Sequence, residues 1–200
     1  MSFQRSEVLR LIVDKHQRMN LEGVFAAGDI WISTEYVFWR DADGDFWLMG
    51  NRSGLIHTRR GVVFPAPITD AIGAISAVDL AATYPLEVPC GTLAVTAISL
   101  RPGMSVTVAD LSEAVAGMPA GLPPDLIHVV SEFPVSATYR PTVSALKAAG
   151  MPKAGRNTWY LDADTGRYKR LTAAARAEQP WRPWLRKRAC PSLKTTPTAT

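Results

Sequence analysis

Few residues in this sequence are arranged so that they could do chemistry. The three histidines, His16, His57 and His128, are far apart and occur in different kinds of segment. His128 lies in the run Ile-His-Val-Val, which is typical of a hydrogen-bonded histidine in a strand rather than of a base or a metal ligand. The sequence has no Gly-x-Ser-x-Gly motif, no His-Glu-x-x-His motif and no glycine-rich phosphate loop. These residues alone therefore assign no reaction.

Three aspartates within residues 41–45 resemble part of a calcium loop. The glycine and distal glutamate spacing that such a loop requires is missing. Because Asp-Gly stands between two aromatic-rich runs, the segment instead predicts the tight turn of a hairpin.

The positive charge is concentrated at the end of the chain. The net charge is +4, but after Glu178 there are five cations and no acidic residue, so the rest of the chain carries −1. A basic tail can bind nucleic acid or an anionic surface. The composition favours a solvated, disordered tail over residues 178–200, and nucleic acid is not the expected partner.

Length and cysteine content indicate an ordinary globular protein of one domain or two. The two cysteines, Cys90 and Cys190, are far apart, which predicts reduced thiols in a cytoplasmic setting. No apolar run approaches the ~18 residues of a membrane span. Met1 to Asn20 also lacks the apolar centre of a secretory signal.

The hydrophobic pattern predicts an α+β chain. Helices are expected over the first twenty-odd residues, after Pro65, after Thr107 with a capping box to Asp110, and from Pro141 to a cap at Gly150. Strands are expected at 30–39, 46–49, 61–64, 78–84, 92–100, 126–130, 159–161 and 168–170.

A series of short motifs runs in a fixed order between residues 23 and 176. In order and spacing they resemble the C-terminal region of AMP-forming acyl-CoA synthetases, in particular the branch of fatty acid transport proteins and very-long-chain acyl-CoA synthetases. The motifs are Gly28-Asp-Ile-Trp31, Asp41-Ala-Asp-Gly44, Asn51-Arg-Ser-Gly-Leu55, Gly61-Val-Val-Phe64, Tyr84-Pro-Leu-Glu-Val-Pro89, Thr138-Tyr-Arg140 and the hairpin from Trp159 to Thr172.

The resemblance implies a domain organisation. Residues 61–177 would form the small mixed-sheet C-terminal lid domain of an adenylate-forming ligase, and residues 51–60 its hinge or connector. Residues 1–50 would be an N-terminal helix and β-hairpin left over from the large domain. This remnant, from Ile30 to Met49, is expected to expose apolar surface when the chain is isolated.

The resemblance also implies a function, the ATP-dependent activation of a fatty acid to its CoA thioester. In that family a large domain binds ATP and the acyl chain, and its phosphate loop has no counterpart here. Catalysis is therefore expected only with a partner chain that carries the ATP-binding domain. ATP, CoA and Mg²⁺ are expected as cofactors on the resemblance alone, and they are not expected to bind the isolated chain tightly. A non-catalytic module that binds a protein or, through the basic tail, nucleic acid is the alternative, and a gene remnant is a third.

Four positions of the family's functional residues are matched, three of them by a different residue type. Tyr36 falls at the ribose-binding aspartate, and a phenol cannot accept hydrogen bonds as a bidentate carboxylate does. Leu55 falls at the hinge aspartate. Arg140 falls at the adenylating lysine, whose compact ammonium a planar guanidinium does not reproduce. Arg52 keeps the family arginine and is the best candidate for a nucleotide contact.

Two glycines of the motifs complete the candidate cofactor-binding set. Gly54 lies in the Asn-Arg-Ser-Gly-Leu motif, and Gly61 opens the next one. Both could be kept for backbone freedom alone.

Overall fold

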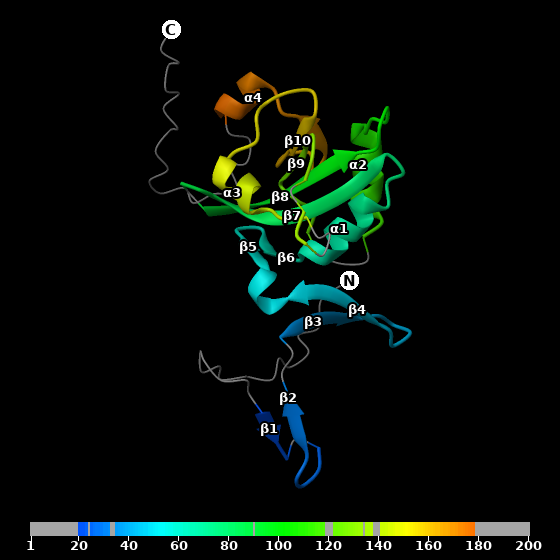
Figure 1. Ribbon diagram of the computed structural model, residues 1–200. Helices are drawn as coiled ribbons and strands as arrows, with labels where there is room; N and C mark the ends of the chain where they lie inside the picture. Colours follow the sequence, from blue (N-terminus) through cyan, green and yellow to red (C-terminus); the bar gives the residue numbers. More distant parts are fainter. Residues whose placement is uncertain are drawn as a thin grey trace. The chain divides into compact units, whose positions relative to one another are not determined.

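The computed structural model describes residues 20–23, 25–32, 35–89, 91–118, 122–133, 135–137 and 141–178. The chain divides into two compact units, Met1–Tyr36 and Val37–Thr200 (Figure 1). The helix predicted for the first twenty-odd residues lies mostly outside the described residues, as does the basic tail after Glu178. Among the described helices, none has the length and apolar character needed to span a membrane.

The first unit contains a small hairpin. Strand β1 (Asn20–Glu22) pairs antiparallel with β2 (Ile30–Ile32). The loop between them is closed by Asp29, whose carboxylate accepts hydrogen bonds from the backbone N–H groups of Phe25 and Ala26 at 3.0 and 3.1 Å. The end of the predicted N-terminal helix is therefore wrong, because residues 20–22 pair across this loop as a strand.

Another hairpin follows at the boundary of the two units, formed by β3 (Tyr36–Arg40) and β4 (Phe46–Asn51), and all of it after Tyr36 belongs to the second unit. Asp41 closes its turn: one carboxylate oxygen accepts from the N–H groups of Asp43 and Asp45, and the other accepts from the Trp47 indole at 2.8 Å. The indole hydrogen bond is the main reason that the pKa of Asp41 is lowered. The predicted tight turn is confirmed.

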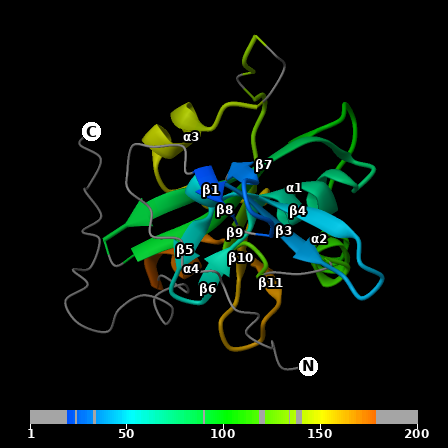
Figure 2. The same ribbon diagram turned by 90° about the horizontal axis from the view of Figure 1, so that it is seen from below.

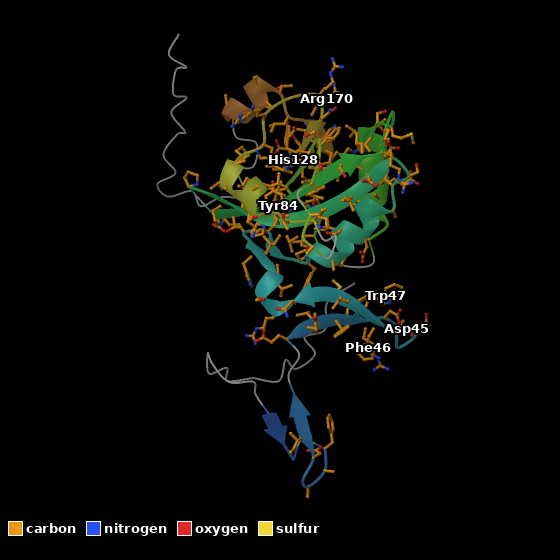
Figure 3. The ribbon with its side chains drawn as sticks, in the orientation of Figure 1. Asp45, Phe46, Trp47, Tyr84, His128 and Arg170 are labelled. Carbon is orange, nitrogen blue, oxygen red and sulfur yellow. The ribbon has the colours of Figure 1, made fainter. Side chains whose placement is uncertain are left out.

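This hairpin carries large apolar side chains that water reaches. Tyr36, Phe38, Phe46, Trp47 and Leu48 are each about half exposed or more, and Figure 3 shows Phe46 and Trp47 near the end of the hairpin. The expected exposed apolar surface is therefore present on β3 and β4. The single strand predicted over 30–39 is instead two strands, and Glu35 before β3 has a φ of 58°.

A five-stranded mixed sheet forms the centre of the second unit (Figure 2). Its strand order is β11-β10-β9-β8-β7, and only β8 and β9 run parallel. The strands are β7 (Val78–Val88), β8 (Gly91–Leu100), β9 (Leu126–Val129), β10 (Thr158–Leu161) and β11 (Tyr168–Arg170).

Strand β7 is longer than the sequence predicts. The prediction ends at Tyr84, whereas the strand continues through Pro85 to Val88. β7 lies at the edge of the sheet, where a proline without an N–H leaves no ladder hydrogen bond unmade. The hairpin predicted from Trp159 to Thr172 is confirmed by the antiparallel pairing of β10 and β11. β7 and β8 also pair antiparallel.

Two helices cover one face of the sheet. α1 (Pro65–Gly73) and α2 (Val108–Ala116) contact each other, lie side by side in Figures 1 and 2, and bury Ile68, Ile72 and Leu111 in a core with β8 and β9. A row of hydroxyls also joins α1 to the sheet. The hydroxyl oxygen of Thr83 on β7 lies 3.4 Å from that of Thr69 on α1 and 2.9 Å from that of Thr96 on β8.

The second face has its own core, to which two short helices contribute. α3 (Ser144–Ala149) and α4 (Ala173–Glu178) contribute Leu146 and Ala175 to the cluster around Tyr84 and Leu171. The start predicted for α3 is wrong. Pro141 forms an isolated bridge with Val135 instead of opening the helix, which begins at Ser144. The predicted cap at Gly150 is confirmed.

The capping box predicted at the start of α2 is present. The Thr107 hydroxyl accepts from the N–H of Asp110, and the Asp110 carboxylate accepts from the N–H of Thr107 at 2.8 Å. This N–H of Thr107 is the main reason that the pKa of Asp110 is lowered.

We expect Thr107→Ala to lower the free energy of unfolding by about 1 kcal/mol, because the first turn of α2 loses a hydrogen-bond acceptor. Urea unfolding followed by circular dichroism measures the difference. Thr107→Ser keeps the hydroxyl and is the control. Equal losses in both variants would contradict a role for the cap.

Candidate functional site

The candidate residues of the connector lie in a short 3₁₀ turn, η1 (Arg52–Gly54), between β4 and β5. Asn51 caps this turn, since its side-chain oxygen accepts from the Ser53 N–H at 2.9 Å and from the Ser53 hydroxyl at 2.6 Å. The backbone N–H of Leu55 closes the turn on the carbonyl of Arg52 at 3.4 Å. The sequence Asn-Arg-Ser-Gly-Leu is thus one capped turn.

The side chains of this turn face different surroundings. Arg52 is exposed, so its guanidinium is accessible to a phosphate, whereas the apolar side chain of Leu55 is half-buried. Gly54 does not have a positive φ, and a Cβ added there would meet no atom within 4 Å. Backbone freedom therefore does not explain Gly54.

Gly61 is explained by the backbone. It opens β6 (Gly61–Val63), which pairs with β5 (Ile56–Thr58), and its φ of 135° is one that L side chains rarely adopt. A Cβ at Gly61 would also lie 3.2 Å from the Leu122 side chain. Its carbonyl accepts a hydrogen bond from the Thr58 hydroxyl at 2.9 Å.

A buried ion pair attaches this hairpin to the sheet. Arg60, in the turn between β5 and β6, donates from Nε to one carboxylate oxygen of Asp125 at 2.8 Å, and its Nη2 lies 2.7 Å from the same oxygen in the ion pair. Arg60 also donates to the carbonyl of Pro123. The Asp125 side chain is 1% exposed and that of Arg60 is 15% exposed.

Asp125 is tied to two strands as well. Its second carboxylate oxygen accepts from the N–H of Ala94 on β8 at 2.7 Å, and its carbonyl accepts from the N–H of Leu161 on β10. Burial raises the pKa of Asp125 above its ordinary value, although the charge of Arg60 and the Ala94 N–H act in the opposite direction. Next to it, the buried hydroxyl of Tyr168 donates to the carbonyl of Pro124 at 2.8 Å.

Two further residues were predicted for the site, Tyr36 and Arg140. Tyr36 is exposed and belongs to the first unit, and Arg140 lies outside the described residues. Arg52, Gly54 and Leu55 share one turn, and Gly61 follows in the hairpin next to it.

A second polar pair is buried on the face of the sheet that α3 and α4 cover. The Tyr84 hydroxyl on β7 and Nε2 of His128 on β9 are 3.0 Å apart, and Figure 3 shows the two side chains close together. Burial lowers the pKa of His128 to about 4 and raises that of Tyr84 to about 12, so at neutral pH both are uncharged. The prediction of a hydrogen-bonded strand histidine is confirmed.

The sequence analysis did not find the Arg60–Asp125 pair or the partner of His128. Ala97 on the intervening strand β8 lies in register with His128, and its small side chain leaves space above the sheet. The sequence does mark one member of each pair: Asp125 is a single charged residue just before an apolar strand, and His128 lies within that strand. Neither signal identifies the partner.

Of the described residues at the matched positions, Arg52 is the one with a charged side chain. Arg52 can donate to a phosphate, but Tyr36 offers no carboxylate to a ribose. Within the described ranges, no group of three or more His, Cys, Asp or Glu side chains could hold a metal ion. We therefore derive no step through ATP or Mg²⁺ from these residues.

Of the comparisons with known proteins, the one with solved structures finds similar proteins. No family model matches the sequence. No curated protein matches it either. Apo MatB from Rhodopseudomonas palustris is 19% identical with a TM-score of 0.51, and the match covers 60% of this chain and 24% of MatB. The anthranilate CoA ligase AuaEII, solved with anthranoyl-AMP, is 22% identical with a TM-score of 0.49 and the same coverage. A fatty acyl CoA synthetase of Mycobacterium tuberculosis is 18% identical with a TM-score of 0.47, again with that coverage.

These neighbours are AMP-forming acyl- and aryl-CoA synthetases. The similarity to MatB shows that the mixed α/β fold with its five-stranded sheet matches a region of the adenylate-forming ligase fold. The chain spans about a quarter of the length of the structures it matches. At this identity the similarity concerns the fold.

Proposed function

We propose that residues 61–177 act as the C-terminal lid domain of a fatty acyl-CoA synthetase, and that they take part in thioester formation only together with an ATP-binding domain. The observation that carries the proposal is the MatB-like fold in a chain whose motifs follow the order of that region. The substrate class, a fatty acid as in the fatty acid transport protein branch, rests on the motifs. A cytoplasmic location rests on the sparse cysteines.

The contacts described above support a pivot at Asn51–Leu55 rather than over the whole connector 51–60. Ile56 is buried in the same core as Val63, and Arg60 is fixed to Asp125. The β5–β6 hairpin would therefore move with the sheet. Since β4 contacts α1 and buries Met49, a swing at the turn must first separate β4 from that helix.

The residue types at the matched positions support dependence on another domain. Adenylation requires donors around the triphosphate and a bound Mg²⁺ to stabilise the charge that develops at phosphorus. Arg52, and Arg140 if it follows the family lysine, would each supply one guanidinium to such a site. Tyr36 and Leu55 would supply neither the ribose contact nor the hinge carboxylate.

We expect the purified 200-residue chain to release no pyrophosphate when it is mixed with ATP, CoA, Mg²⁺ and fatty acids of several lengths. A coupled pyrophosphate assay measures this, with a full-length acyl-CoA synthetase as the positive control. Turnover by the chain alone, well above the background without enzyme, would overturn the dependence on a second domain. Arg52→Met would then show whether the turn contributes to that activity.

A further inference from the structure

A cleft of about 670 Å³ opens on the face of the sheet that α3 and α4 cover. It lies away from the connector, and neither the sequence motifs nor the proposed function assigns it a role. Its size is within the range of small-molecule sites. Its described lining comes from β7, β9, β10, α3, the segment between α3 and β10, and α4.

One wall of the cleft is largely apolar. Leu146 on α3 and Met151 after it are half-buried and belong to the hydrophobic cluster of this face. The buried Tyr84–His128 pair places one polar point beside these side chains. Such a wall can pack against the aliphatic or aromatic part of a ligand, and the neighbouring Tyr84–His128 pair can orient that ligand by a polar contact.

The charged residues around the cleft have one sign. Among the described lining residues the charged ones are Lys153, Arg156 and Arg176, and all three are exposed cations. None of them forms an ion pair within the described part of the chain, where the ion pairs are Arg60–Asp125 and Lys169–Asp162. Three cations of this kind raise the local concentration of anions and can donate to a phosphate or carboxylate.

We propose that this cleft binds a small amphipathic anion, with its phosphate or carboxylate head on Lys153, Arg156 and Arg176 and its apolar body against Leu146 and Met151. This site is separate from the connector, and it does not depend on the proposed ligase function. A phosphomonoester, which carries up to two charges, matches the three cations better than a carboxylate does.

Titration of the full chain with four probes distinguishes the contribution of the anionic group of the ligand from that of its apolar part. Fluorescence or calorimetric titration is expected to show saturable binding of 1-naphthyl phosphate. Inorganic phosphate, which lacks the body, and 1-naphthol, which lacks the charge, are each expected to bind about tenfold more weakly or worse. 1-Naphthoate tests the head group: tighter binding of 1-naphthoate than of 1-naphthyl phosphate would identify a carboxylate head and support the same site.

Variants tie the binding to this cleft. Arg156→Met is expected to weaken binding of 1-naphthyl phosphate about tenfold, because one of the three cations that would contact the phosphate is lost. Arg156 is exposed, so the substitution is expected to leave the fold unchanged. Arg170→Met, which removes an exposed cation of β11 outside the lining, is the matched control and is expected to bind as the wild type does. Figure 3 labels Arg170.

Three results would overturn the proposal. They are equal binding of 1-naphthol and 1-naphthyl phosphate, equal binding of inorganic phosphate and 1-naphthyl phosphate, and equal weakening by Arg156→Met and Arg170→Met. Circular dichroism of both variants confirms that folding is unchanged, and a failure of the ligase assay leaves this test intact.

Discussion

Replacing Asp125 by alanine is expected to lower the free energy of unfolding by about 3–5 kcal/mol. The substitution leaves the Arg60 guanidinium, which is mostly buried, without its carboxylate. It also leaves the N–H of Ala94 without the side-chain oxygen that it contacts at 2.7 Å. A charge and a backbone donor both lose their partners at the start of β9, and each loss costs free energy.

Urea unfolding of the wild type and Asp125→Ala measures the difference. Lys169→Ala is the matched control, because Lys169 also forms an ion pair at 2.8 Å, to Asp162, but is half exposed. Exposed pairs contribute little, so this variant is expected to unfold near the wild-type urea midpoint. The double variant Arg60→Met with Asp125→Leu is expected to recover much of the lost stability, because no charge is then left unpaired. Equal midpoints for Asp125→Ala and Lys169→Ala would contradict a buried, stabilising pair.

The protein is expected to lose stability as the pH falls from about 6.5 to about 4, by up to about 3 kcal/mol. In the unfolded chain His128 takes up a proton near its ordinary pKa of 6.5, whereas in the folded chain burial lowers this pKa to about 4. Between these values the unfolded state binds more protons than the folded state. The contribution is therefore complete above pH 6.5 and is lost on acidification.

Urea unfolding at several pH values, from 7 down to 4, measures this loss. His128→Gln keeps a hydrogen-bonding partner for Tyr84 but does not titrate, so its stability is expected to depend less on pH in this range. His57→Gln removes an exposed histidine of β5 and is the control for replacing a histidine by glutamine elsewhere in the chain. If His128→Gln and the wild type changed in parallel, another group would have to be responsible.

Local features of the fold were predictable because neighbouring residues determine them. The Asp41 turn, the capping box at Thr107 and the cap at Gly150 each depend on residues within a few positions of one another. Where prediction failed, a distant or competing contact decides. Asn20–Glu22 pairs with β2, Pro141 bridges to Val135, and β7 continues through Pro85 because it is an edge strand.

The candidate site was predictable only where it is continuous in the chain. Arg52, Gly54 and Leu55 form a single turn because they are adjacent. Arg60 and Asp125, by contrast, are 65 positions apart, and Tyr84 and His128 meet across an intervening strand. Such pairs depend on the strand order β9-β8-β7, which the pattern of apolar residues does not specify.

The threonines between α1 and the sheet have a consequence for how that helix docks. Burial of apolar surface is not directional, so the isoleucines of α1 do not by themselves fix where the helix lies along the sheet. Thr69, Thr83 and Thr96 lie in a row, so a slipped helix would separate hydroxyls that are buried or half-buried from each other. The three threonines therefore favour one position of α1 along the sheet, which the apolar contacts alone would not select.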